Sequence, residues 1–383
     1  MKRSTDRILT THTGSLPRPE DLIGLIRGRL AGTESDPAAL AARAKSAVAD
    51  IVRKQVDAGV DVVSDGEQSK PAFNTYVTQR LAGFGGENRE PRPRAEAEDF
   101  PGWASQQAQG STQATMMRRG FCLEPLTYQG EEAVDADIAN LKSALAQTPA
   151  VEAFIPAASP GTIHYTMANK HYPSDEAYLF ALADAMREEY RAIAEAGLVL
   201  QIDAPDHAMD RHVSFKNNTV DEFRKVQAVR VEALNHALEG IPEEQIRYHV
   251  CWGNYEGPHT HDVPLTDILD LIFQVRAGAY SIEASNPRHA HEWQVWKEAK
   301  LPPGKILIPG VIDTTTNFVE HPEVVAQRIE QFARLVGREN VMAGTDCGFG
   351  TSAGRDRVHP EVVWGKLGAL AEGAEIASKR LWG

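Results

Sequence analysis

The chain has few cysteines, no long apolar run and no excess of positive charge. The cysteines are few and odd in number: Cys122, Cys251 and Cys347. Such a set does not form a disulfide framework, and it indicates a reducing compartment in which the thiols stay free. No apolar run approaches the roughly 18 residues of a membrane span. Residues 1–13 are polar and lack the apolar stretch of a signal peptide. We therefore expect a cytoplasmic protein.

The charge balance excludes other classes of partner. There are 40 Lys and Arg against 53 Asp and Glu, so the net charge is −13. An acidic surface argues against binding to nucleic acid or to an anionic membrane. The 383 residues exceed one average domain but fit a barrel of roughly 250 residues that carries insertions. Small molecules are the expected partners, and the sequence leaves homo-oligomerisation open.

Short apolar runs recur along the chain, and each ends in polar residues that are capable of chemistry. The runs are residues 8–11, 60–63, 151–155, 198–202, 246–248, 280–282, 306–308 and 341–343. Helical patterns lie between most of them, for example at 175–196, 219–238, 265–276 and 321–336. Strands that alternate with helices indicate a parallel sheet, and eight such units predict an α/β fold, a single (β/α)8 TIM barrel, with its active site at the strand carboxyl ends. A doubly wound sheet is the competing fold, but no run precedes a Gly-x-Gly-x-x-Gly loop.

The stretch between the second and third runs is too long for one helix. Residues 84–118 are rich in Gly, Pro, Gln, Ser and Thr, and residues 121–129 resemble an extra hairpin. We expect an insertion or lid over 84–130. No linker divides the chain, so residues 1–383 are predicted to form one barrel domain.

Four residues at the ends of predicted strands form a candidate metal site. His249 and Cys251 are two residues apart, so in an extended segment they point to the same side. Glu283 ends the next strand, and Cys347 ends the last. Because a barrel closes on itself, these four side chains face one mouth. One His, two Cys and one Glu form a ligand set suited to Zn²⁺.

Several short motifs carry a resemblance to a known family. In chain order they are residues 10–17 (TTHTGSLP), 65–67 (DGE), 201–203 (QID), 249–251 (HVC), 281–283 (SIE) and 345–348 (TDCG). Together they resemble the zinc-bearing catalytic barrel of the cobalamin-independent methionine synthase family. The resemblance extends over nearly all of residues 1–383.

The resemblance implies a zinc-dependent methyltransferase, or more broadly a thiol S-alkyltransferase, in which zinc holds the substrate thiol as a thiolate. The implied zinc ligands are His249, Cys251, Glu283 and Cys347. Glu67 and Asp203 match the carboxylates that hold the substrate amine, while Thr13 and Ser15 match the segment that holds its carboxylate. We predict Glu67, Asp203 and Asp313 as catalytic residues. Carboxylates at strand ends also cap helices, which is the alternative for Glu67 and Asp203.

The chain departs from the family on the side of the alkyl donor. Full-length family members have two barrels, whereas the resemblance here covers one. Thr315 stands where the family has a histidine proposed to assist catalysis, and Asp203-Ala204-Pro205 replaces Asp-Glu-Pro. The resemblance therefore favours a homocysteine-like thiol but leaves the donor open: methyl-folate, another methyl carrier or an epoxide.

Three alternatives to methyl transfer follow. The first is a zinc-dependent transfer of coenzyme M to epoxides on the same scaffold, for which Arg18, Lys70, Arg288 and Arg355 are candidate sulfonate partners. The second is a thiol-binding or zinc-storing protein without catalysis. The third is a relation to the decarboxylase barrels without zinc, which the His-x-Cys, Glu and Cys set argues against.

A second group of histidines follows the fifth and sixth runs. It consists of His259, His261, His289 and His291. They fit acid–base groups at the barrel mouth, because a histidine titrates near neutral pH. They equally fit loop positions without a role. Trp252, Tyr255, Trp293 and Trp296 lie near the same rim and fit either an aromatic wall or core packing.

Overall fold

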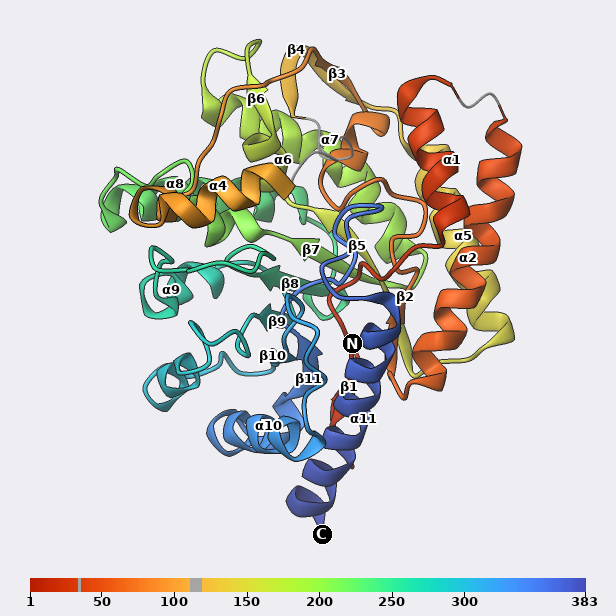
Figure 1. Cartoon of the computed structure of the whole chain (residues 1–383), viewed down its shortest axis with the longest axis vertical. Coiled ribbons are helices and arrows are strands. Elements are labelled where there is room, and N and C mark those ends of the chain that lie inside the picture. The colour runs from red at the N-terminus through yellow and green to blue at the C-terminus, as the bar shows by residue number, and fades with distance from the viewer. Residues whose placement is uncertain (34–35, 111–118) are drawn as a thin grey trace.

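The computed structural model describes residues 1–33, 36–110 and 119–383. Within these residues, eight parallel strands form a central barrel (Figure 1). They are β1 (Leu9–Thr10), β2 (Val62–Ser64), β5 (Glu152–Ala158), β7 (Val199–Asp203), β8 (Ile246–Val250), β9 (Ala279–Ile282), β10 (Ile306–Ile312) and β11 (Met342–Thr345). They pair in the order β1-β11-β10-β9-β8-β7-β5-β2, and a parallel bridge from Thr11 to Val62 closes the ring. The predicted TIM barrel is confirmed.

The amino end of the barrel is filled by side chains from seven of these strands. They form a buried cluster of Leu9, Val62, Phe154, Val199, Ala279, Ile306, Ile308 and Met342. β8 contributes Arg247 instead, whose guanidinium lies 4.0 Å from the centre of the Phe154 ring. Arg247 donates hydrogen bonds to Thr11 Oγ1 at 2.9 Å and to the His12 carbonyl at 2.6 Å. This packed floor leaves polar side chains to the carboxyl end.

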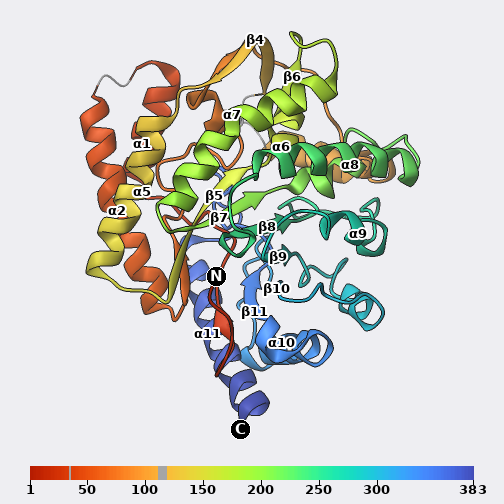
Figure 2. The same ribbon diagram turned by 180° about the vertical axis from the view of Figure 1, so that it is seen from behind.

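Helices surround the barrel, as the two opposite views show (Figures 1 and 2). The longer ones are α1 (Glu20–Ala31), α2 (Pro37–Asp57), α5 (Glu131–Gln147), α7 (Asp175–Glu195), α8 (Val220–Ala237), α10 (Pro322–Val336) and α11 (Pro360–Trp382). α8 begins with a capping box, in which Thr219 and Glu222 satisfy each other's backbone N–H groups. The helix predicted over 265–276 is wrong. That segment forms a 3-10 turn, η5 (Leu265–Asp267), and the short α9 (Leu269–Ile272), because Ile268 departs from helical geometry with φ −127°.

The insertion builds a small sheet on the rim of the barrel. β3 (Leu81–Gly85) pairs antiparallel with β4 (Gly120–Tyr128), and β4 pairs parallel with β6 (Met167–Asn169). The expected hairpin at 121–129 is therefore wrong: these residues belong to the single strand β4. α3 (Glu96–Asp99) and α4 (Pro101–Gly110) lie between β3 and β4. Part of the predicted lid, residues 111–118, lies outside the described residues.

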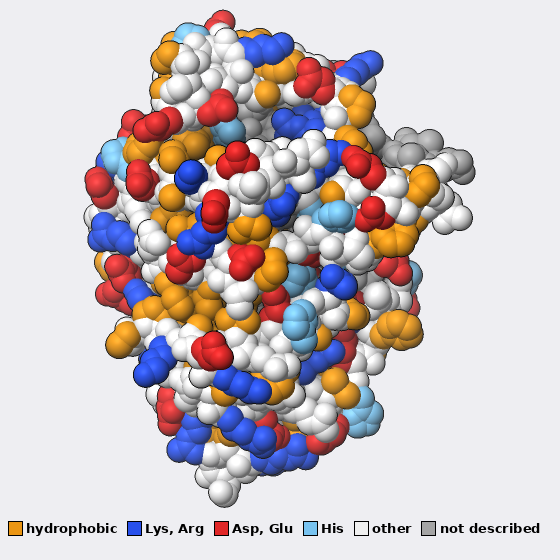
Figure 3. Space-filling model, turned by 90° about the vertical axis from the view of Figure 1, so that its left-hand side faces the viewer, with side chains coloured by type: hydrophobic (Ala, Val, Ile, Leu, Met, Phe, Trp, Pro, Cys, Tyr) orange, Lys and Arg blue, Asp and Glu red, His pale blue; other side chains and the backbone are white. Residues whose placement is uncertain are grey.

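The surface carries charges of both signs. On the face drawn in Figure 3, acidic and basic side chains are interspersed with small groups of hydrophobic ones. Among the described residues, the helices are too short or too polar to cross a bilayer.

A buried arginine anchors the small sheet to two helices of the barrel. Arg80 directly precedes β3 and contacts Asp137 Oδ2 on α5 at 2.6 Å and Glu189 Oε2 on α7 at 3.1 Å. Tyr76 donates a further hydrogen bond to Glu189 Oε1 at 2.7 Å. All three charged side chains are at most 6% exposed, so each depends on its partners for solvation.

We expect Arg80→Met to lower the free energy of unfolding by about 3–5 kcal/mol, because it leaves two buried carboxylates without their cation. The matched control is Arg53→Met at an exposed position of α2, with an expected change of less than about 0.5 kcal/mol. Urea unfolding followed by circular dichroism measures both. Equal midpoints for the two variants would contradict the proposed anchor.

Candidate metal centre and substrate cavity

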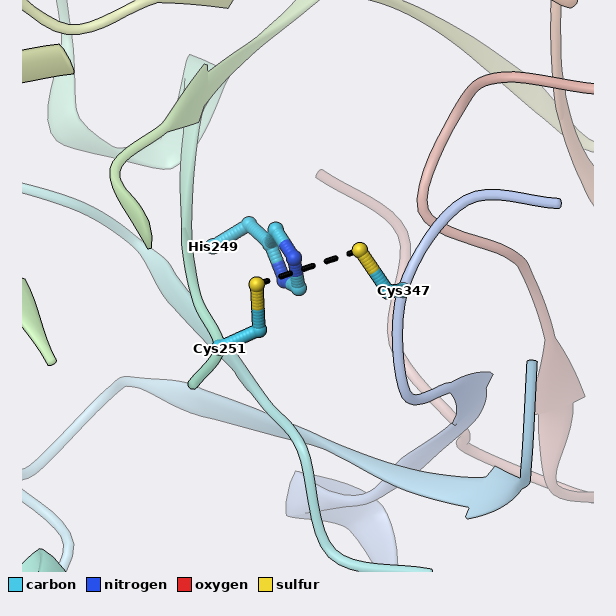
Figure 4. A group of neighbouring side chains, drawn as sticks. All are labelled: His249, Cys251 and Cys347. Carbon is cyan, nitrogen blue, oxygen red and sulfur yellow. Dashed lines mark hydrogen bonds between the residues drawn. The ribbon is translucent and has the colours of Figure 1, made fainter. Parts of the chain in front are cut away.

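Three potential metal ligands converge at the carboxyl end of the barrel. His249 is on β8, Cys251 follows it by two residues, and Cys347 follows β11 (Figure 4). Ligand atoms of all three lie within 4.8 Å of one another, and the two Sγ atoms are 3.8 Å apart. β9 and β10 separate β8 from β11 in the sheet, so it is the curvature of the barrel that brings the two cysteines together.

The three donors fit a zinc ion. Two sulfurs bound to one tetrahedral zinc at about 2.3 Å lie about 3.8 Å apart. Both ring nitrogens of the buried His249 are without a hydrogen-bond partner in the described part of the chain. Burial lowers the pKa of His249 to about 3, which keeps the imidazole in the neutral form that binds metals. The hydrogen bond with Cys347 and burial raise the pKa of Cys251, so two thiolates here require a cation.

Glu283 immediately follows β9, beside this group. Its Oε2 accepts a hydrogen bond from the Trp252 backbone N–H at 2.9 Å, and it is not among the atoms that cluster within 4.8 Å. Burial raises the pKa of Glu283 to about 7. The Asp346 carboxylate accepts backbone hydrogen bonds from Ala284 and Ser285, which ties this segment to Cys347. The role of Glu283 as a fourth ligand stays a prediction.

Glu67 and Asp203 line the same cavity as the three ligands. Strand register places Asp203 on β7 opposite His249 on β8. Glu67 follows β2 and has φ 54°, a left-handed conformation that is costly for a residue with a side chain. Gly66, with φ 63°, completes the sharp turn that aims Glu67 inward. Neither carboxylate is the N-cap of the 3-10 helix that follows it, because other residues hold those positions.

Both carboxylates are buried without full compensation. Burial raises the pKa of Glu67 to about 7, although Lys70 and Arg18 act in the opposite direction. Glu67 Oε2 has no hydrogen-bond partner among the described residues, and Arg18 Nη2 is 3.8 Å away. Burial and the nearby charge of Glu67 raise the pKa of Asp203 well above its usual range. The pair is therefore prepared for a positively charged ligand.

Thr13 and Ser15 also line the cavity, as the resemblance implies. Thr13 Oγ1 donates a hydrogen bond to the Thr345 carbonyl at 3.0 Å, which joins the segment after β1 to the end of β11. Ser15 lies against Gly348, where an added Cβ would come within 2.0 Å of Ser15 Oγ. A side chain at position 348 would thus displace Ser15. Their contact with a substrate carboxylate stays a prediction.

Asp313 is not brought into the cavity. Its Oδ1 accepts a hydrogen bond from Thr315 Oγ1 at 2.8 Å, and its Oδ2 accepts from Thr316 N–H at 2.8 Å. Asp313 and Thr315 line a separate surface depression instead. The carboxylate holds the turn after β10, which leaves its predicted catalytic role without geometric support.

The cavity, with a volume of about 210 Å³, has further walls that the sequence did not indicate. They include Phe73, Asn74, Arg94, Thr162, Asn254 and Arg357. Arg94 comes from the insertion, where no motif marked it. Arg355, a candidate from the sequence, also lines the cavity, whereas Arg18 donates hydrogen bonds to backbone carbonyls and Lys70 donates to the Pro156 carbonyl. Tyr165 and Phe73 are the aromatic side chains that line the cavity in the described part of the chain, and Trp252 packs in the core.

The second histidine group gathers around one carboxylate. Asp262 lies 2.8 Å from His212 Nδ1, 2.7 Å from His259 Nδ1 and 2.8 Å from His289 Nε2. Burial alone would lower the pKa of His289, but hydrogen bonds to Asp262 and Glu292 raise it to about 10. Burial alone would raise the pKa of Asp262, but its hydrogen bonds to the three histidines hold that pKa well below its usual range. Although these side chains are potential metal ligands, their close mutual contacts favour a structural network.

Two of the predicted histidines lie apart from this network. His261 Nε2 is 2.6 Å from Asp99 Oδ2 at the end of α3, so it contacts the insertion. His291 precedes the 3-10 helix η6 (Glu292–Lys297). Neither of them lines the cavity.

Comparison with known proteins agrees with the resemblance. Residues 124–362 match the family described as cobalamin-independent synthase, catalytic domain. The chain belongs to this family. The methionine synthase of Thermococcus kodakarensis is 25% identical over 377 residues, which are 97% of this chain and 94% of that protein. A methionine synthase of Saccharolobus islandicus is 24% identical over 380 residues, or 97% of this chain and 95% of that protein.

Solved structures of family members share the fold. A B12-independent methionine synthase from Shewanella sp. W3-18-1, solved in complex with selenomethionine, superposes with a TM-score of 0.72 at 23% identity, covering 98% of this chain and 99% of that one. A putative vitamin-B12 independent methionine synthase from Listeria monocytogenes gives a TM-score of 0.65 at 19% identity, with the same coverage. The chain therefore shares its fold with these structures over nearly its whole length.

The raised pKa of Glu67 predicts how the free energy of unfolding of this protein changes with pH. The folded state keeps a proton on Glu67 up to a pKa of about 7, whereas the unfolded chain releases it at about 4.5. The folded protein therefore binds more protons between these values, and wild-type stability falls as pH rises through this window. Glu67→Gln removes that dependence. Its stability relative to wild type should rise by about 2–3 kcal/mol between pH 4.5 and pH 8.

Urea unfolding at several pH values measures this difference at matched metal content. Glu232→Gln on the exposed face of α8 is the control, and its curve should run parallel to wild type. A constant difference between Glu67→Gln and wild type across the window would show that folding does not raise the pKa of Glu67.

Proposed function

We propose that this protein is a zinc-dependent thiol S-alkyltransferase, specifically a methyltransferase acting on a homocysteine-like amino acid. One observation carries the proposal: a single cavity joins the group of His249, Cys251 and Cys347 to the buried carboxylates of Glu67 and Asp203. An amino thiol requires a metal ion to bind its sulfur and, beside it, carboxylates to bind its ammonium group. Membership of the cobalamin-independent synthase family supports the same reaction.

The proposed metal ligands are His249, Cys251, Glu283 and Cys347. When bound, zinc stabilises the substrate sulfur as a thiolate at neutral pH, by the same electrostatic effect that lowers the pKa of zinc-bound water. His249, Cys251 and Glu283 are buried and Cys347 is partly buried, which limits the access of water to the metal position. The segment anchored by Asp346 holds Glu283 next to them.

The remaining cavity residues orient the substrate. Glu67 and Asp203 bind its ammonium group, and that added positive charge opposes the effect of burial, which raises the pKa values of both carboxyl groups. Thr13 and Ser15 bind its carboxylate. The substrate sulfur then forms a bond to the alkyl carbon of the donor, while the bond from that carbon to its carrier breaks and the carrier keeps the electron pair. Asp313 takes no part, because Thr315 and Thr316 occupy its carboxylate.

Cys347→Ser should remove most of the zinc and nearly all activity, because structural and catalytic zinc sites require their thiolate ligands. Metal content by mass spectrometry should give about one zinc per wild-type chain after chelator-free, reducing purification. Cys122→Ala is the matched control, since Cys122 is buried in β4 away from the cavity. Full turnover by a zinc-free Cys347→Ser protein would refute the zinc mechanism.

Asp203→Asn should raise KM for homocysteine by about 10- to 100-fold, because a charge-assisted contact to the ammonium group is lost. The same variant should bind 4-mercaptobutanoate, which lacks the amine, about as well as wild type does. Steady-state kinetics with both thiols separates these effects. An equal loss for both thiols would assign Asp203 to general cavity structure instead of amine recognition.

Addition of a thiol to an epoxide is the second candidate. Arg355 and Arg357 favour it, because they line the cavity and suit a sulfonate-bearing thiol such as coenzyme M. Turnover of a short epoxide with that thiol, and none with methyl donors, would select this reaction.

A further inference from the structure

Positive charge gathers at the mouth of the cavity although the chain as a whole carries −13. Arg94 comes from the insertion, and Arg355 and Arg357 come from the segment between β11 and α11, which also contains Cys347. All three line the cavity that contains the candidate metal ligands. The two segments are far apart in the sequence, and folding brings their arginines together at the cavity.

No ion pair joins these arginines to an acidic side chain among the described residues, in contrast to the buried Arg80 and Arg230. Arg230 contacts Asp206 and Asp210, and Arg80 contacts two carboxylates as described above. Arg94 instead stacks on Tyr255, with its guanidinium 3.7 Å from the ring centre, and its buried Nε has no hydrogen-bond partner.

The pKa of Arg357 reflects its burial beside other positive charges. Burial, followed by the charges of Arg355 and Arg94, lowers the pKa of Arg357 to about 10. Glu256 and Cys347 act in the opposite direction but do not cancel the effect. Three like charges that repel each other around a cavity are stabilised by an anion that enters it.

The acidic residue nearest to these two arginines in the sequence does not pair with either of them. Arg355 and Arg357 are two residues apart, and Asp356 lies between them. The charge that acts most strongly on Asp356 is Arg18, which is hydrogen bonded to the Gly350 carbonyl behind this segment. No ion pair joins Asp356 to Arg355 or Arg357 in the described part of the chain, so both cavity arginines are available to a ligand.

We propose that Arg94, Arg355 and Arg357 form an anion subsite that binds a carboxylate, phosphate or sulfonate group of a substrate during alkyl transfer. The role of this subsite in alkyl transfer rests on the proposed function, whereas the binding of an anion to it does not. The amine and carboxylate of an amino thiol are assigned to the inner part of the cavity, so the anion at the mouth belongs either to the alkyl donor or to a sulfonate-bearing thiol. Arginine suits all three anions because its planar fork forms paired hydrogen bonds.

The first test uses inorganic sulfate, which does not require a known donor. Isothermal titration calorimetry on the zinc-loaded protein should detect sulfate binding, and the double variant R355Q/R357Q should bind it at least about tenfold more weakly. Arg53→Gln on the exposed side of α2 is the matched control for net charge and should bind like wild type. Identical binding by all three proteins, or none by wild type, would overturn the subsite.

The second test assigns the anion to a substrate. In steady-state assays, a tenfold or larger rise in donor KM for R355Q/R357Q, with thiol KM unchanged, places the anion on the donor. The reverse pattern places it on the thiol. If neither KM changes by more than twofold, the subsite has no role in substrate binding and the proposal fails.

The two tests also separate this proposal from the proposed function. A protein that binds sulfate through these arginines but does not alkylate any thiol would refute the function and leave the anion subsite standing. Arg94→Gln provides an independent check, because it alters the insertion side of the cluster. It should weaken sulfate binding in the same direction without loss of the zinc measured by mass spectrometry.

Discussion

Closure of the parallel barrel is the constraint on which the candidate site depends. Cys251 and Cys347 are separated by 96 residues, and a single bridge from Thr11 to Val62 joins the first and second strands to complete the ring. Once the ring closes, the ends of β7, β8 and β11 face a common axis. The same closure places two carboxylates opposite two thiols, so binding of an amino thiol and binding of a metal become parts of one geometry.

Much of this geometry was predictable because it follows from strand periodicity. The eight apolar runs and the polar residues at their ends specify a barrel, and a barrel specifies one active mouth. His249, Cys251 and Cys347 could therefore be assigned to one site before any coordinates. The sequence could not show that Glu283 also accepts a backbone hydrogen bond from Trp252, since that contact depends on the path of the loop after Cys251.

Other features depended on tertiary context that no local pattern encodes. The helical periodicity at 265–276 was real, yet Ile268 interrupts it and only short turns form. Asp313 ends a strand as a catalytic residue would, but neighbouring threonines bind its carboxylate. Arg94 lies in an insertion with no regular pattern, and only the folded path of that insertion brings it to the cavity.

The carboxylate of Asp262 has a consequence for how this scaffold could change over evolution or in design. It binds histidines from the loops after β7, β8 and β9, so these three loops share one buried anchor. A substitution in one of them disturbs the packing of the other two, and such loops cannot diversify independently. The insertion is tied to the same group, because the Ala95 N–H donates a hydrogen bond to the His212 carbonyl. New substrate preferences are therefore more accessible through the stretch that follows Cys347.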